Sequence, residues 1–251
     1  MVAVGRRHRL LRIVREQEAD IFARKLGLVV RSGPAQGLRL LTNSSWGKSD
    51  LANKVMGLYE QPVHSFIGSI SPIRRVVCIG AADGYYGVGL VVSGKASSAT
   101  CFEMSDKGRE VIEATAAFNG VSHKVEVLGK ADDFTIKACL KDELSDLFLI
   151  DIEGGEYDLL SAPVLESMSR SHVLVELHPH LVCDGERAQC RLLDDAAKYF
   201  HVSIINDDNR ILPDLPELKQ LSDDQRWLMC SEAREHQMRW LALTPRKRHT
   251  T

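Results

Sequence analysis

The sequence predicts an α/β fold in which a mostly parallel sheet is covered by helices on both faces. From Arg74 onward, short apolar runs rich in β-branched residues alternate with amphipathic stretches. The apolar runs are nearly continuous, which is typical of strands buried on both faces. Because strands that alternate with helices pair in parallel, these two observations predict the fold class.

The expected elements follow one another without an internal repeat. Strands are expected at Arg75–Gly80, Ala99–Met104, Lys124–Leu128, in the runs that begin at Asp146 and His172, and at Val202–Ile205 and Arg239–Pro245. Helices are expected at Tyr85–Ser93, Asp106–Asn119, Phe134–Lys141, Tyr157–Ser169 and Arg187–Phe200. The alternation predicts that residues 71–251 form one ligand-binding domain.

Residues 1–70 have a different character and are predicted to form an N-terminal helical extension. Helical periodicity covers His8–Leu26 and Ser49–Glu60, and the segment between them is rich in Gly, Ser and Pro, as loops are. We expect this extension to pack on the sheet domain and to reach its ligand. Its side chains that could line an acceptor pocket are Trp46, Tyr59 and His64.

Composition narrows the classes of function. The chain has 251 residues, 26% of them charged, and a formal net charge of -2, so no overall field favours nucleic acid. No apolar run has the length of a membrane span. The 6 cysteines form no CxxC pair, which is typical of reduced cysteines. We therefore expect a cytoplasmic protein that binds neither nucleic acid nor membrane.

The turn after the first expected strand, "GAADGYYG", indicates the ligand. Gly80 and Gly84 allow a tight turn and a close approach of ligand to backbone. A dinucleotide fingerprint requires a glycine at Ala82, and Asp83 places a negative charge where a diphosphate would lie. Both features favour a ligand with an ammonium and a sulfonium and without phosphates, which is S-adenosylmethionine, over NAD.

Other residues are expected to complete this cofactor site. Ala81 and Tyr85 flank the turn, and the amides that open the following helix could bind the ligand carboxylate. Glu103 follows the second strand, where an acid can accept hydrogen bonds from ribose hydroxyls. Asp132 follows the third strand and could reach an adenine amino group. Alternatively, Asp83 and Asp132 could simply cap helices, and Glu103 could be a surface acid.

With these residues in view, the chain resembles the class I S-adenosylmethionine-dependent methyltransferases, and within them the FkbM-like family. The motifs that carry the resemblance are "CIGAADGYYGVGL", "CFEMSDKGREVIEATAAFNGV", "LFLIDIEGGEYDLL" and "VLVELHPH". The resemblance implies a Rossmann-like sheet of seven strands whose last strand is antiparallel, a bound methyl donor, and O-methylation. The chain departs from the family at Cys78, where an acid is usual, and at Ala82.

The acids and histidines after the fourth and fifth strands are the candidate catalytic residues. Methyl transfer to a hydroxyl needs a base, and His178 is the first choice because its ordinary pKa lies nearest neutrality. Asp151 and Glu153 are further candidates, and Asp151 is also expected to contact the cofactor. The same three side chains could instead hold Mg²⁺, or His178 could make only a structural hydrogen bond.

These observations lead to one favoured function and two alternatives. The favoured function is O-methylation of a small molecule or a carbohydrate with S-adenosylmethionine as the donor. A nucleotide-binding or NAD-dependent Rossmann enzyme is one alternative. A catalytically silent, methyltransferase-like binding module is the other, because Cys78 and Ala82 depart from the family pattern. Neither the acceptor nor the oligomeric state can be predicted, since function does not follow from fold.

Overall fold

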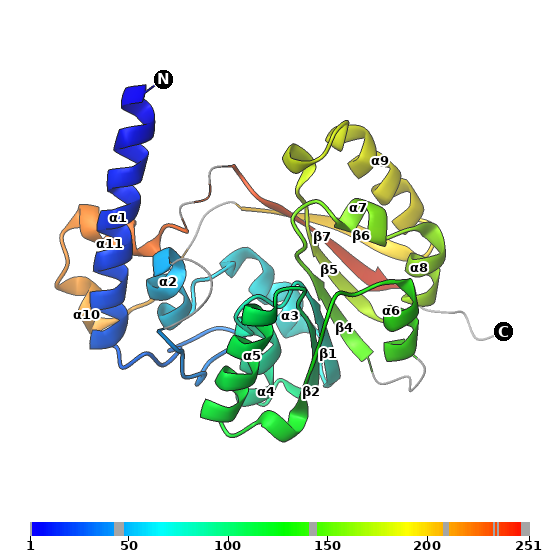
Figure 1. Cartoon of the computed structure of the whole chain (residues 1–251), viewed down its shortest axis with the longest axis horizontal. Helices are drawn as coiled ribbons and strands as arrows, with labels where there is room; N and C mark the ends of the chain where they lie inside the picture. Colours follow the sequence, from blue (N-terminus) through cyan, green and yellow to red (C-terminus); the bar gives the residue numbers. More distant parts are fainter. Residues whose placement is uncertain are drawn as a thin grey trace.

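Seven strands form one sheet in the computed structural model, which describes residues 2–42, 48–140, 145–207, 211–232, 234 and 236–246. The strands are β1 (Ile73–Ile79), β2 (Ala96–Phe102), β3 (Val125–Leu128), β4 (Ser145–Ile150), β5 (His172–Glu176), β6 (Phe200–Asn206) and β7 (Arg239–Pro245). Their order is β3-β2-β1-β4-β5-β7-β6 (Figure 1). Strands β1 to β5 pair in parallel, and β7 is antiparallel to both β5 and β6. The predicted fold class is confirmed.

The sheet is buried on both faces because its strands carry apolar side chains at successive positions. In β1, Val76 and Cys78 join the hydrophobic cluster on one face, whereas Val77 and Ile79 join the cluster on the other. Side chains alternate between the faces of a strand, so a continuous apolar run supplies both clusters.

Helices cover each face. One face carries α4 (Tyr85–Val92) and α5 (Asp106–Phe118). The opposite face carries α6 (Asp133–Leu140), α8 (Ala162–Ser167) and α9 (Gly185–Ala196), with the short α7 (Glu156–Leu159) nearby (Figure 1). Short 3₁₀ turns occur at η1 (Lys48–Asp50), η2 (Gln61–Val63), η3 (Ser122–Lys124) and η4 (Pro179–Leu181).

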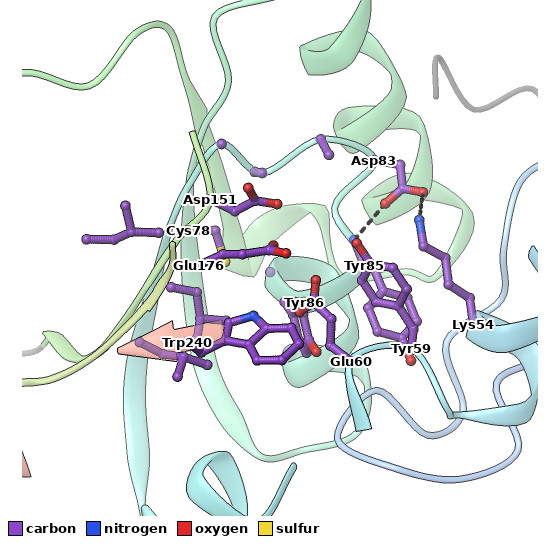
Figure 2. A pocket seen from close by; sticks show the side chains of 17 residues that line it. Lys54, Tyr59, Glu60, Cys78, Asp83, Tyr85, Tyr86, Asp151, Glu176 and Trp240 are labelled. Carbon is purple, nitrogen blue, oxygen red and sulfur yellow. Dashed lines mark hydrogen bonds and ion pairs between the residues drawn. The ribbon is translucent and has the colours of Figure 1, made fainter. Parts of the chain in front are cut away.

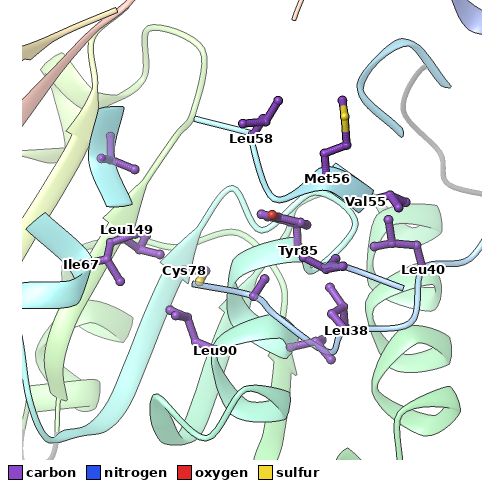
Figure 3. Packing of buried hydrophobic residues seen from close by; sticks show 14 of the residues in the cluster. Leu38, Leu40, Val55, Met56, Leu58, Ile67, Cys78, Tyr85, Leu90 and Leu149 are labelled. Carbon is purple, nitrogen blue, oxygen red and sulfur yellow. The ribbon is translucent and has the colours of Figure 1, made fainter. Parts of the chain in front are cut away.

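The N-terminal extension contributes to the same core. It contains α1 (Val2–Lys25), α2 (Leu51–Met56) and α3 (His64–Ser69). Figure 3 shows Leu38, Val55 and Leu58 of the extension packed with Tyr85 and Leu90 of α4, all within one buried cluster. The extension therefore packs against the helices and strands on one face of the sheet.

Three local differences from the sequence prediction have physical causes. The helix expected at Tyr157–Ser169 is divided into α7 and α8, because Pro163 cannot donate a helical hydrogen bond and would clash within a continuous helix. The helix expected at Ser49–Glu60 ends at Gly57, which is left-handed with φ +74°. The sequence analysis does not predict three of the helices, α3, α10 (Pro216–Lys219) and α11 (Asp223–Cys230). Of these, α11 packs beside α1 (Figure 1).

Candidate functional site

The loop between β1 and α4 lies against the end of β4. Gly80 has φ +81°, and a Cβ added there would lie 1.7 Å from the backbone oxygen of Asp151. The N–H of Asp151 in turn donates to the carbonyl of Ile79 at 2.9 Å. Strand order reverses between β1 and β4, and ligands of open α/β sheets bind at such a switch point.

Glu103, directly after β2, holds this loop in place. Its buried carboxylate accepts hydrogen bonds from the N–H of Ala82 at 3.0 Å and of Ser105 at 2.9 Å. Gly108 leaves room for it, since an added Cβ there would lie 2.6 Å from the Cγ of Glu103. A carboxylate oxygen has a second lone pair, so Glu103 can accept hydrogen bonds from a ligand as well.

A cavity of about 810 Å³ opens at the carboxyl ends of β1, β2 and β4. Its lining includes five of the predicted site residues, Gly80, Glu103, Asp132, Asp151 and Glu153. Pockets for small ligands usually measure about 300–1,000 Å³. The structure therefore brings together, around one cavity of suitable size, residues that follow four different strands, β1 to β4.

Asp132 lines this cavity and also caps a helix. Its carboxylate accepts a hydrogen bond from the N–H of Thr135 at 2.8 Å at the start of α6. This hydrogen bond lowers the pKa of Asp132 below its ordinary value. Both interpretations of the sequence are thus compatible with its position.

The other predicted residues of the turn face away from the large cavity. Ala81, Asp83 and Tyr85 line a smaller cavity of about 70 Å³ beneath the loop (Figure 2). Gly84 faces α4 and α5, where an added Cβ would meet Val88 at 3.0 Å. These positions are close to the large cavity without forming its wall.

Asp83 forms a buried ion pair with the N-terminal extension. Its carboxylate lies 2.5 Å from the Nζ of Lys54 in α2 and accepts a hydrogen bond from the N–H of Tyr85 at 3.2 Å (Figure 2). Burial would lower the pKa of Lys54, but Asp83 and Asp50 outweigh this effect and raise it. Lys54 lines both cavities and was not identified from the sequence.

His178 is oriented by Glu156, a fully buried carboxylate. Glu156 accepts the N–H of His178 at 2.8 Å, lies 3.3 Å from its Nδ1, and accepts the N–H of Gly154 at 2.8 Å. Burial would lower the pKa of His178, yet the hydrogen bond with Glu156 and the surrounding carboxylates raise it. His178 is therefore a weaker candidate for a base than its ordinary pKa implies.

Asp151 is the better candidate. Burial of its carboxyl, together with the charges of Glu60 and Glu153, raises the pKa of Asp151 to about 7. The Nε2 of His178 lies 3.6 Å from Asp151 and 3.7 Å from Glu153. A carboxyl group that titrates near neutrality can accept a proton under ordinary conditions.

The same side chains bear on metal binding. Ligand atoms of Asp151, Glu153 and His178 lie within 4.8 Å of one another, so the geometry admits a cation there. A metal-bound histidine must be neutral, however, and the carboxylates around His178 favour its protonated form.

Arg234 closes the site from the C-terminal part of the chain. Its guanidinium pairs with Glu176 at the end of β5, with Glu60 of the extension at 3.1 Å and with Glu232 at 2.7 Å. Glu232 also accepts the N–H of Glu60 at 2.8 Å. Sequence reasoning missed Glu60, Glu232 and Arg234, because their pairing links segments far apart in the chain and leaves no local pattern.

The aromatic residues proposed for an acceptor pocket have different positions. Tyr59 lines the two cavities described above and packs edge-on against Tyr85, with ring centroids 5.2 Å apart. His64 is bonded through its Nε2 to the carbonyl of Tyr59 at 2.9 Å, which is a structural contact. Trp46 lies outside the described residues.

No protein-family model matches the chain, and no curated protein is detectably similar to it in sequence. Solved structures with a similar fold include the B. subtilis M1A22 tRNA methyltransferase TrmK (12% identity, 75% of this chain, 67% of that chain, TM-score 0.46). An O-methyltransferase from Bacillus cereus in complex with SAH is 13% identical over 73% of this chain and 80% of that chain, with a TM-score of 0.47. Precorrin 8W decarboxylase from Methanobacterium thermoautotrophicum is 12% identical over 76% of this chain and 91% of that chain, with a TM-score of 0.48.

Among the described residues, no helix is both long and apolar enough to cross a bilayer. The fold class is established by the strand order and strand pairing of the chain itself.

Proposed function

We propose that this protein is a methyltransferase that uses S-adenosylmethionine to methylate a hydroxyl group of a small molecule or a carbohydrate. The observation that carries the proposal is the single cavity at which Gly80, Glu103, Asp132 and Asp151 meet. The sequence alone predicts each of these residues as a contact for this donor. The resemblance to the FkbM-like family, which includes the "DIEGGEYDLL" run, supports the same assignment.

The cavity has suitable groups for each part of the donor. Glu103 would accept hydrogen bonds from the ribose hydroxyls, and Asp132 would accept one from the adenine amino group. Met104, on the same wall, offers an exposed thioether for contact with the adenine ring. When bound, the donor supplies a methyl group on a positively charged sulfur.

The geometry is less suitable for a dinucleotide. A diphosphate needs free amides at the start of the helix that follows the glycine turn. Here the Asp83 carboxylate accepts the N–H of Tyr85 and occupies that position. A second negative charge would be repelled from the same place, so NAD is the weaker proposal.

Asp151 is proposed as the base. As the acceptor oxygen bonds to the methyl carbon, the carbon–sulfur bond breaks and its electron pair remains on sulfur. The acceptor hydroxyl proton passes to the Asp151 carboxylate, whose pKa of about 7 is matched to this role. Glu156 holds His178 in place, and the imidazole of His178 in turn orients the neighbouring Asp151 carboxylate. Holding both reactants in line supplies much of the remaining acceleration.

An acidic pocket beside the cavity bears on the acceptor. It measures about 180 Å³, and the side chains that line it are Asp50, Tyr59, Asp151, Glu153, Glu176, His178, Glu232 and Arg234. Carboxylates outnumber cations in this lining, so phosphorylated or carboxylated acceptors would be repelled. We therefore propose an acceptor without negative charge, which also disfavours nucleic acid.

Calorimetric titration with S-adenosylhomocysteine, S-adenosylmethionine and NAD tests the proposal. Both adenosyl ligands are expected to bind, and NAD is not. Glu103→Gln should weaken their binding about tenfold or more, because it removes a charged acceptor. Glu113→Gln, an exposed change on α5, is the matched control and should leave affinity unchanged. Absence of binding by both adenosyl ligands would refute the proposal and leave the binding-module alternative.

A further inference from the structure

Lys54 lies at the boundary between the large cavity and the small cavity behind the loop. It belongs to α2 of the N-terminal extension and lines both spaces. Its side chain is 12% exposed and that of Asp83, its partner, is 14% exposed. The helix is held firmly, since Asn53 beside Lys54 donates a hydrogen bond to the carbonyl of Ser231 at 2.8 Å.

The surroundings of Lys54 are strongly acidic. The carboxylates in the lining of the small cavity are Glu60, Asp83, Asp151 and Glu176, and Lys54 is the cation in that described lining. In the large cavity the other cation of the described lining is Lys130, which lies beside Asp132 in the chain. Arg234 also lies near Asp151, but it is shared among three carboxylates, whereas Lys54 is paired with Asp83. At the Asp151 end, therefore, Lys54 is the cation that can exchange its partner for a negatively charged ligand group.

Two amides at the start of α4 are already bonded within the chain. The sequence favoured the first amides of α4 for the ligand carboxylate, but Tyr85 donates its N–H to Asp83. The N–H of Gly84 donates to the carbonyl of Ala81 at 2.8 Å. These two donors are occupied within the chain.

We propose that Lys54 binds the carboxylate of the amino-acid end of the donor, and that Asp83 then binds its ammonium. This inference rests on the proposed function and adds to it a binding pair supplied partly by the N-terminal extension. In the free protein Lys54 and Asp83 neutralise each other. An α-amino acid group carries one positive and one negative charge. When it binds, its carboxylate replaces Asp83 as the partner of Lys54, and its ammonium replaces Lys54 as the partner of Asp83. Such an exchange avoids leaving a buried charge without a partner, which would be costly.

The test compares S-adenosylhomocysteine with its decarboxylated analogue, which retains the ammonium group. Calorimetry gives Kd for both ligands with the unmodified protein, Lys54→Met and Lys54→Gln. The unmodified protein should prefer S-adenosylhomocysteine by about 10- to 100-fold, as expected for a charged hydrogen bond. Both variants should reduce that preference to about twofold or less, with the analogue bound as tightly as before or more tightly, because it no longer leaves Lys54 without a partner. Lys198→Met, which removes an exposed lysine of another ion pair, should retain the preference.

Each outcome separates the two proposals. If the unmodified protein binds neither ligand, the proposed function fails. If it binds both with equal affinity, or if the variants keep the full preference, the function stands and the role of Lys54 is refuted. Lys54→Gln can still donate a hydrogen bond to Asp83, so it provides the result should Lys54→Met not fold.

Discussion

The carboxylate of Glu156 accepts the backbone N–H of His178 at 2.8 Å, although 22 positions separate the two residues. Its other oxygen accepts the N–H of Gly154. One fully buried side chain thus joins the loop after β4 to the end of β5. The two loops that carry the candidate catalytic groups are fixed relative to each other by this residue.

Glu156→Gln is expected to lower the free energy of unfolding by about 1–3 kcal/mol, because an amide cannot accept both sets of hydrogen bonds. It should also lower the pKa of His178, measured by NMR titration. Because the pKa of His178 is raised in the folded protein, its protonation contributes to stability. This contribution is complete below the ordinary pKa of about 6.5 and is lost as pH rises through the folded pKa. The variant should therefore lose more stability in acid than in base. Exposed Glu166→Gln is the control, and an unchanged His178 pKa would contradict the prediction.

Asp151→Asn is expected to stabilise the protein above neutral pH. Since the folded pKa of Asp151 is raised to about 7, the folded state binds its proton more tightly than the unfolded state does. The resulting stability is present in acid and is lost as pH rises from about 4 to about 7. Denaturant unfolding at several pH values should show a gain for the variant at about pH 8 that vanishes at about pH 4. A gain independent of pH would argue against this titration.

Ala82→Gly is expected to stabilise the loop. Ala82 has φ +53°, in the left-handed region. A residue with a Cβ is destabilised in that conformation by about 1–2 kcal/mol, which the substitution would relieve. Glycine loses more conformational entropy on folding, and this offsets about 0.5–1 kcal/mol of the gain in stability. Gly80→Ala in the same loop should have the opposite effect, because its Cβ would collide with the Asp151 carbonyl. Denaturant unfolding measures both changes, and destabilisation by Ala82→Gly would contradict this account.

Arg234→Met is expected to destabilise the protein by about 3–5 kcal/mol, the usual effect of leaving buried carboxylates without their cation. The loss should be smaller in acid, where Glu60 and Glu176 can take up protons. Burial raises the pKa of both carboxyls even beside Arg234. Thermal and denaturant unfolding provide the measurement. Arg24→Met, which breaks an exposed pair with Asp20, should change stability by less than about 0.5 kcal/mol. Equal effects of the two substitutions would show that the Arg234 cluster is not strongly coupled.

Much of the fold could be predicted because its signals are local. The apolar run Val76–Ile79 supplies both faces of the sheet, and Gly80 marks the turn that follows. Glu103 and Asp132 could be placed because residues after parallel strands share one edge. The start of α11 also has a local signal, because the capping box of Ser222 and Gln225 is a pattern in the sequence itself.

The rest of the site depends on pairings that no local pattern records. Lys54 meets Asp83 across the interface between the extension and the sheet, and Arg234 meets Glu60 across 174 positions of the chain. The pKa values depend on the same long-range contacts. His178 could be identified from its position after β5, but its proton affinity depends on Glu156, which lies 22 positions away in the chain.

The cluster around Arg234 has a consequence for biosynthesis. Glu60 leaves the ribosome long before Arg234, yet both pair within one buried cluster. A growing chain that ends before Arg234 already contains Glu60 and Glu176, but it lacks the cation with which both carboxylates pair. The ion-pair cluster that closes the candidate site is therefore completed late in synthesis.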